Sequence, residues 1–139
     1  MRSVLLVILI FLTAGVRYAI ADICVNDRLT VSDVRGRVVA AWRGGVSPIP
    51  GASIKLREYR NDEWQTKAKV TGDENGVFSF GGVPSGEYEL YVAASAFRSF
   101  GTRVRVKGKA KPAPGREIVV NLEPLGCGSA VLRKAEKQR

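Results

Sequence analysis

The sequence predicts an all-β protein: a seven-stranded β-sandwich preceded by a signal peptide. Two observations predict the sandwich. Apolar residues recur at every second position in short segments, and clusters of Gly, Pro, Asn and Asp separate these segments about every 8–12 residues. Beyond the amino-terminal segment, no part of the sequence has the apolar period of an amphipathic helix.

The amino-terminal segment has the three parts of a secretory signal peptide. A positive charge is followed by an apolar run at residues 4–16 and by an Ala-x-Ala sequence that ends at Ala21. We therefore expect cleavage before Asp22, which removes residues 1–21. A retained membrane anchor is the alternative, but a spanning helix needs about 20 apolar residues, and Arg17 interrupts this run. The protein is accordingly expected to be secreted or periplasmic, with membrane contact only through the signal.

Turn residues divide the rest of the chain into expected strands. A Gly- and Pro-rich stretch at residues 44–51 ends the first strand, because proline cannot donate to a ladder. Asn75-Gly76 is a strong hairpin signal, because both residues tolerate a positive φ. The expected strands are residues 33–42, 52–56, 64–70, 77–80, 88–92, 102–106 and 117–122. This pattern assigns residues 22–127 to the sandwich and the polar, basic residues 128–139 to a flexible tail.

The alternation along these strands also predicts the core. Side chains at every second position point to the same face, so one face of each sheet is expected to be apolar. The residues expected in one core between the two sheets are Ile54, Leu56, Phe78, Phe80, Tyr88, Leu90, Ile118 and Val120.

The two cysteines, Cys24 and Cys127, lie near the two ends of the chain that remains after cleavage. Exported proteins mature in oxidising compartments, and an even number of cysteines leaves no unpaired thiol. We therefore expect a Cys24–Cys127 disulfide, which would close a loop of about 100 residues and stabilise the fold by roughly 4–5 kcal/mol. Metal ligation or a nucleophilic thiol would need a histidine partner, and the chain has none.

The lack of histidine also removes the usual means of catalysis. The sequence has no Ser-His-Asp arrangement, no zinc triad and no usual general base. Two carboxylate pairs, Asp73–Glu74 and Glu87–Glu89, leave a hydrolase as a remote alternative. The first pair lies in a predicted turn and offers too few oxygen donors for calcium, and the second lies on the polar face of a strand. We expect no catalytic residues, no metal and no cofactor.

Three segments together carry a family resemblance. Residues 71–92 contain a Thr, an Asn-Gly turn, Phe-x-Phe, a Pro-x-Gly turn and Tyr-x-Leu-x-Val; VRGRV at residues 34–38 and PIPGASIKL at residues 48–56 lie upstream. Over residues 33–123 the chain resembles the carboxypeptidase regulatory-like family of transthyretin-like (prealbumin-like) β-sandwiches. The resemblance implies a Greek-key sandwich of the immunoglobulin-like or transthyretin-like kind.

The resemblance also implies a non-enzymatic module: an aid to folding or stability beside a peptidase, or a binding or spacer domain. Similar hydrolases of purine breakdown use histidines, which this chain lacks. Collagen-adhesin-type sandwiches form a Lys–Asn isopeptide bond. Asn121 would suit such a bond, but the opening strand has Arg35 and Arg37 instead of lysine, and the acid position falls on Val92. Where the family often has Gly before a Phe, this sequence has Ala96, which leaves the geometry of that turn open.

Five basic residues at every second position form the most distinctive charge pattern, which we call the basic ladder. They are Arg103, Arg105, Lys107, Lys109 and Lys111. In an extended chain their side chains share one face at a spacing of about 6.6 Å. Such a face suits anionic polymers or lipid head groups. The simpler explanation is that the charges protect an exposed edge strand from pairing with another chain.

Three aromatic residues, Trp42, Tyr59 and Trp64, offer a platform for sugars, although core packing is the simpler explanation for Trp64. The formal net charge of +9 favours anionic partners. We therefore expect a secreted or periplasmic, non-enzymatic accessory or interaction module whose partner is a protein or an anionic envelope polymer; nucleic acid is not an expected partner. The alternative is a polyanion- or carbohydrate-binding module that uses the basic ladder.

The exported protein should begin at Asp22 and contain the Cys24–Cys127 disulfide. The intact mass of the purified protein should match residues 22–139 and should rise by two protons on reduction. Two free thiols in freshly purified native protein would contradict the disulfide, and a mass that includes residues 1–21 would contradict the cleavage.

Overall fold

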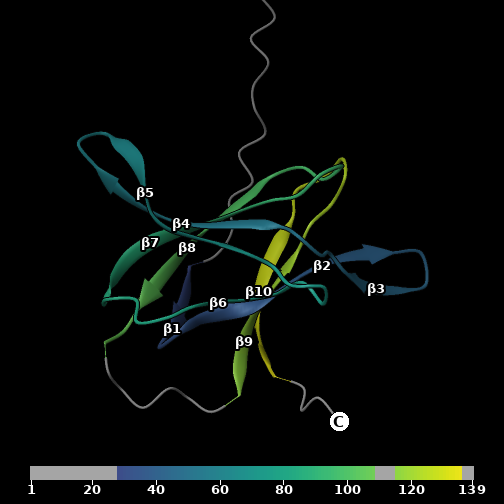
Figure 1. Ribbon diagram of the computed structural model, residues 1–139, viewed down its shortest axis with the longest axis horizontal. Helices are drawn as coiled ribbons and strands as arrows, with labels where there is room; N and C mark the ends of the chain where they lie inside the picture. Colours follow the sequence, from purple (N-terminus) through teal and green to yellow (C-terminus); the bar gives the residue numbers. More distant parts are fainter. Residues whose placement is uncertain (1–27, 109–114, 136–139) are drawn as a thin grey trace, which may run out of the picture.

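Ten strands and no helix make up residues 28–108 and 115–135, the parts of the chain that the computed structural model describes (Figure 1). They form two mixed sheets around one core, which confirms the predicted all-β sandwich. Sheet A consists, in spatial order, of β1 (Leu29–Val31), β8 (Phe100–Val106), β7 (Gly86–Ala93), β4 (Ser53–Arg60) and β5 (Glu63–Thr71). Sheet B consists of β10 (Ser129–Lys134), β9 (Arg116–Asn121), β2 (Val34–Trp42) and β3 (Gly45–Pro48), with β6 (Val77–Phe80) also paired to β2. No helix in the described ranges is long and apolar enough to cross a membrane.

Strand β2 is the strand on which sheet B is assembled. On one edge it pairs in parallel with β9, and on the other edge it pairs antiparallel with β6 along its first half and with β3 along its second half. The close approach of β2 to β9 requires a glycine at position 36. A Cβ at Gly36 would lie 1.9 Å from the carbonyl oxygen of Ile118, which is far inside van der Waals contact.

The predicted core is confirmed. All the residues expected there are buried in one cluster between the sheets: Ile54, Leu56, Phe78, Phe80, Tyr88, Leu90, Ile118 and Val120. Val34 and Leu122 of the sheet B side, and Val92 and Val104 of sheet A, join the same cluster. Each buried aliphatic side chain of this size contributes roughly 1.5–3 kcal/mol relative to an exposed one, so this cluster is the main source of stability.

Each predicted strand is present, and three further strands were not predicted. β1 and β3 are short, and β3 falls in the Gly- and Pro-rich stretch that was expected to break the sheet. Its Pro48 lies at the end of a strand on the edge of sheet B, where a missing donor is tolerated.

The prediction of a flexible tail over residues 128–139 is wrong for Ser129–Lys134, which form β10 and pair antiparallel with β9. Ala130 is buried, and Leu132 packs against the core from the same strand face. Ala130-Val131-Leu132 is a run of only three apolar residues beside basic ones, which is a weak sequence signal. The partner strand therefore decides the conformation of this segment. Residues 136–139 lie outside the described residues.

The turn between β7 and β8 contains a non-glycine residue in a left-handed conformation. Ala96 has a φ of 66°, which places its Cβ close to the carbonyl oxygen of the same residue. The family resemblance implied Gly at this position and left the geometry of the turn open. The backbone has the left-handed conformation that glycine adopts most easily, although the residue is alanine.

Replacing Ala96 with Gly should stabilise the protein. The left-handed conformation costs an alanine about 1–2 kcal/mol, and the extra freedom of glycine in the unfolded chain offsets about 0.5–1 kcal/mol of the gain. We expect a net increase of roughly 0.5–1 kcal/mol in the free energy of unfolding, measured by urea titration. Ala41→Gly, in the ordinary extended backbone of β2, should have the opposite sign. Equal destabilisation by both changes would contradict the strain at Ala96.

Candidate functional site

The hairpin formed by β4 and β5 leaves sheet A at its far end. β4 pairs with β7 only from Ser53 to Arg57, whereas its pairing with β5 continues to Arg60. The register of β4 and β5 also shifts between Leu56 and Arg57, and such a bulge increases the local twist. Figure 1 shows this hairpin projecting from the body on the side opposite the β2–β3 hairpin.

Aromatic rings and an arginine are ordered against one another along this hairpin and on the exterior of sheet A. The rings of Tyr59 and Trp64 meet edge to face with centroids 5.2 Å apart. The guanidinium of Arg57 lies 4.2 Å from the ring centroid of Tyr91 and 5.8 Å from that of Trp64, both within cation–π range. Arg57 also donates from Nε to Oε1 of Glu89 at 2.9 Å. Trp64 is therefore held in place while 38% of its surface stays exposed.

The divergence of the hairpin from β7 leaves an open hollow of about 860 Å³. Its lining is contributed by the hairpin, by β7 and β8, and by the residue before β1: Arg28, Glu58, Tyr59, Trp64, Glu87, Tyr88 and Arg103. Tyr88 forms part of the floor, and its hydroxyl donates to the carbonyl oxygen of Pro84 at 2.9 Å. We call this site the hairpin hollow.

Both carboxylates of the hairpin hollow are held in the ionised form by neighbouring cations. Hydrogen bonding by Lys67, and then by Arg60, lowers the pKa of Glu58, whose Oε2 lies 3.2 Å from Nζ of Lys67. The hydrogen bond from Arg105 is the main cause that lowers the pKa of Glu87. Each carboxylate thus has at least one cation beside it, and these contacts leave the hollow without excess negative charge.

Arg103 differs from Arg28, Arg57 and Arg105, because it forms no ion pair or hydrogen bond with a carboxylate among the described residues, although its charge is a minor cause of the lowered pKa of Glu87. Its neighbour across the β7–β8 ladder is Glu89, but that carboxylate is engaged by Arg57. Arg28 lies 3.5 Å from Glu87, and Arg105 donates to the same side chain. The hairpin hollow therefore presents, beside two aromatic rings, the Arg103 guanidinium, which has no hydrogen bond to a carboxylate among the described residues.

The structure describes three of the five residues of the basic ladder. Arg103 and Arg105 are exposed on one face of β8 while Val104 and Val106 point into the core, and Lys107 follows, exposed. Lys109 and Lys111 lie outside the described residues. Arg105 is committed to Glu87, so the described part of the ladder is not a uniform row of free cations. The edge-protection hypothesis is wrong for Val104–Val106, because these residues pair with β1 as well as with β7. Phe100–Arg103 pair with β7 alone among the described strands.

The aromatic residues are placed differently from the expectation of core packing. Trp64 and Tyr59 are exposed, and together they form the aromatic part of the hollow. Trp42 is also exposed, but it lies at the end of β2 on the other hairpin. A platform of all three rings does not form. Asn61 and Asp62, which lie between two of the expected strands, form the turn of this hairpin with positive φ. Asn and Asp are common turn residues, but they do not indicate that the two strands leave the sheet.

Three of the four carboxylates considered for catalysis, Asp73, Glu87 and Glu89, have structural partners, and Glu74 is exposed in the turn. Oδ1 of Asp73 accepts hydrogen bonds from the backbone N–H groups of Asn75 and Val77, each at 2.8 Å, as in an Asx turn. Glu87 and Glu89 are both in ion pairs with arginine. The described residues hold no group of three or more His, Cys, Asp or Glu side chains that is placed to bind a metal.

Other predicted site residues lie partly or wholly outside the described ranges. Cys127 is not a free thiol, but its expected partner Cys24 lies outside the described residues, so their pairing stays a prediction. The cleavage position, Ala21 and Asp22, also lies outside them. Asn121, considered for an isopeptide bond, accepts a hydrogen bond from the backbone N–H of Ala41 at 2.8 Å through Oδ1.

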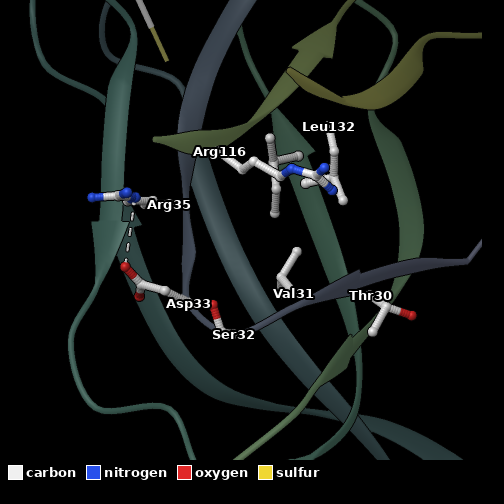
Figure 2. Close-up of a pocket in the computed structure, with 8 residues that line it drawn as sticks. Thr30, Val31, Ser32, Asp33, Arg35, Arg116 and Leu132 are labelled. Carbon is white, nitrogen blue, oxygen red and sulfur yellow. Dashed lines mark ion pairs between the residues drawn. The ribbon is translucent and has the colours of Figure 1, made fainter. Parts of the chain in front are cut away.

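A second, smaller hollow of about 90 Å³ lies where β1 and β2 meet β9 and β10. Figure 2 shows the Asp33 carboxylate directed toward the guanidinium of Arg35, with Oδ2 and Nε 3.6 Å apart, while Val31 and Leu132 supply apolar surface. At about 30 Å³ for each water molecule, this volume holds roughly three waters. It is too small for an organic ligand of ordinary size.

Comparison with known proteins agrees with this architecture. A family model described as the carboxypeptidase regulatory-like domain matches residues 33–118. Among solved structures, the crystal structure of sea bream transthyretin in complex with thyroxine is similar, with a TM-score of 0.52 and 15% sequence identity over 77% of this chain and 99% of that chain. At this identity the similarity shows the fold alone. No curated protein matches the chain.

Removing the Arg105 side-chain charge should raise the pKa of Glu87 toward its ordinary value. The hydrogen bond from Arg105 favours the ionised carboxylate, so Arg105→Gln withdraws the main cause of the lowered pKa. Because the folded pKa is the lower one, this pair stabilises the fold above the ordinary pKa of Glu, and that contribution is lost as the pH falls through the lowered pKa. Carboxyl-detected NMR titration measures the change. Lys107→Gln should leave Glu87 unaffected, and equal effects of the two variants would contradict the pairing.

Proposed function

The chain belongs to the carboxypeptidase regulatory-like family, and from that premise we propose that it is a non-enzymatic accessory or interaction module of the extracytoplasmic space. A carboxypeptidase regulatory-like, transthyretin-like sandwich fits an accessory module. Secretion or periplasmic location, and a partner that is a protein or an anionic envelope polymer, are parts of this proposal. The amino-terminal signal pattern and the basic charge of the chain support them.

One observation supports a specific interaction surface: the mutually packed cluster of Arg57, Tyr59, Trp64 and Tyr91. Tyr59 and Trp64 of this cluster are exposed and line the hairpin hollow. Trp, Tyr and Arg are the residue types that most often dominate binding energy at protein surfaces. Their packing against one another reduces the side-chain entropy that binding would otherwise cost. We therefore place the interaction surface on the exterior of sheet A and the β4–β5 hairpin.

The alternative function, binding of a polyanion or carbohydrate, is favoured by a different observation. Within the described part of the chain, Arg103 presents a guanidinium that forms no ion pair with a carboxylate, in the same hollow as Tyr59 and Trp64. A small anionic ligand and a protein partner are therefore competing occupants of one surface. They are separable by experiment, because a protein partner forms a covalent adduct of defined mass with a cross-linker.

Site-directed photo-cross-linking in the native host tests the interaction surface. Benzoylphenylalanine in place of Trp64 should yield a covalent adduct with a protein or an envelope polymer, identified by mass spectrometry after denaturing purification. The control places the same residue at Val131, which is exposed to a similar degree on the exterior of sheet B. A dominant adduct from position 131, or no adduct from position 64, would contradict the proposed surface.

A further inference from the structure

The aromatic side of the hairpin hollow suits the face of a sugar ring. Tyr59 is 56% exposed and Trp64 is 38% exposed, and each is braced by the other. These rings form open, flat apolar surface at the edge of the hollow. The C–H face of a pyranose is apolar and flat, and stacking it on such rings removes both surfaces from water.

The polar side of the hollow favours a ligand that carries both hydroxyl groups and a carboxylate. Glu87 is ionised and keeps acceptor positions beyond those used by Arg105 and Arg28, because a carboxylate has about four lone-pair sites. Sugar hydroxyls can donate to these positions. Oε2 of Glu58 is buried and its Oε1 accepts from Arg60, so Glu58 is less accessible to a ligand. Arg103, without a carboxylate partner among the described residues, can donate two parallel hydrogen bonds to one incoming carboxylate.

The mixed charge of the lining favours a sugar acid over an acidic peptide. An acidic peptide places several carboxylates in the hollow, where Glu58 and Glu87 would repel all but the one at Arg103. A carboxylated sugar brings several hydroxyl donors with each carboxylate, so Glu87 can accept hydrogen bonds from the same ligand whose carboxylate pairs with Arg103. The volume of about 860 Å³ lies in the range of about 300–1,000 Å³ that ligand sites occupy, so more than one ring fits.

We propose that the hairpin hollow binds a carboxylated oligosaccharide, with Arg103 pairing with a carboxylate and with Trp64 and Tyr59 stacking on the sugar rings. This inference rests on the proposed function, because it names the ligand class of the same surface. It also differs from the basic-ladder hypothesis, in which each cation contributes a similar share.

Tryptophan fluorescence can report on this site selectively. The chain has two tryptophans, and Trp42 lies on the β2–β3 hairpin, which Figure 1 shows on the opposite side of the molecule. In a Trp42→Phe background, Trp64 is the reporter. The probe is an oligomer of galacturonic acid, and the controls are its neutral methyl ester and poly-glutamate.

We expect a saturable change in Trp64 fluorescence with the galacturonic acid oligomer. Affinity should fall by about tenfold or more for Arg103→Gln and for the methyl ester, as expected for loss of a hydrogen-bonded charge pair. Lys107→Gln removes one charge directly after the last residue of β8, at a position that does not line the hollow. This change should alter affinity by no more than about twofold. Thermal unfolding of each variant verifies that it is folded.

Three results would overturn the inference: no saturable change, equal losses for Arg103→Gln and Lys107→Gln, or equal binding of poly-glutamate. The second points to the basic ladder and the third to an acidic peptide. A protein adduct from position 64, combined with no oligosaccharide binding, would overturn the sugar assignment and leave the interaction module intact. Failure of both experiments would overturn both.

Discussion

The pairing of β2 along both of its edges is the constraint on which the rest of the structure depends. β9 occupies one edge, and β6 and β3 share the other. The absence of a side chain at Gly36 allows the approach to Ile118. With these neighbours in place, Val34 and Val38 point into the core with no exposed surface. Sheet A can then close over a continuous apolar layer.

The exterior of sheet A follows from the burial of its interior. Because side chains alternate across a strand, burying Leu56, Leu90 and Val104 places Arg57, Glu89 and Arg103 on the solvent face. The ion pairs formed there contribute little to stability, as exposed pairs generally do. Their larger effect is to determine which arginine side chains remain available to bind an anionic ligand. Arg57 donates to Glu89 and Arg105 donates to Glu87, whereas Arg103 forms no ion pair with a carboxylate among the described residues.

The alternation of apolar and polar residues predicted the core well, because the burial of a strand residue depends on its own type and on the face to which it points. Ile54, Leu56 and Leu90 lie between residues that carry polar groups, and each is fully buried. Patterns failed where a partner from elsewhere in the chain decides the outcome. β10 has only Ala130 and Leu132 as apolar contacts, and it becomes a strand because β9 offers a free edge. β8 has the charges of an edge strand, yet β1, from the beginning of the described chain, pairs with its last three residues, Val104–Val106.

The sequence by itself determined the fold class, the seven principal strands, their buried faces and the absence of histidine chemistry, because these depend on residue type and on a period of two. It also identified Ala96 as a departure from the glycine that the family resemblance implies, and the backbone there has the positive φ that glycine adopts most easily. Only the tertiary structure decided which residues form the candidate site. Arg28, Trp64, Glu87 and Arg103 come from separate segments. They meet because β4 leaves β7 after Arg57, at a bulge whose position no local pattern specifies.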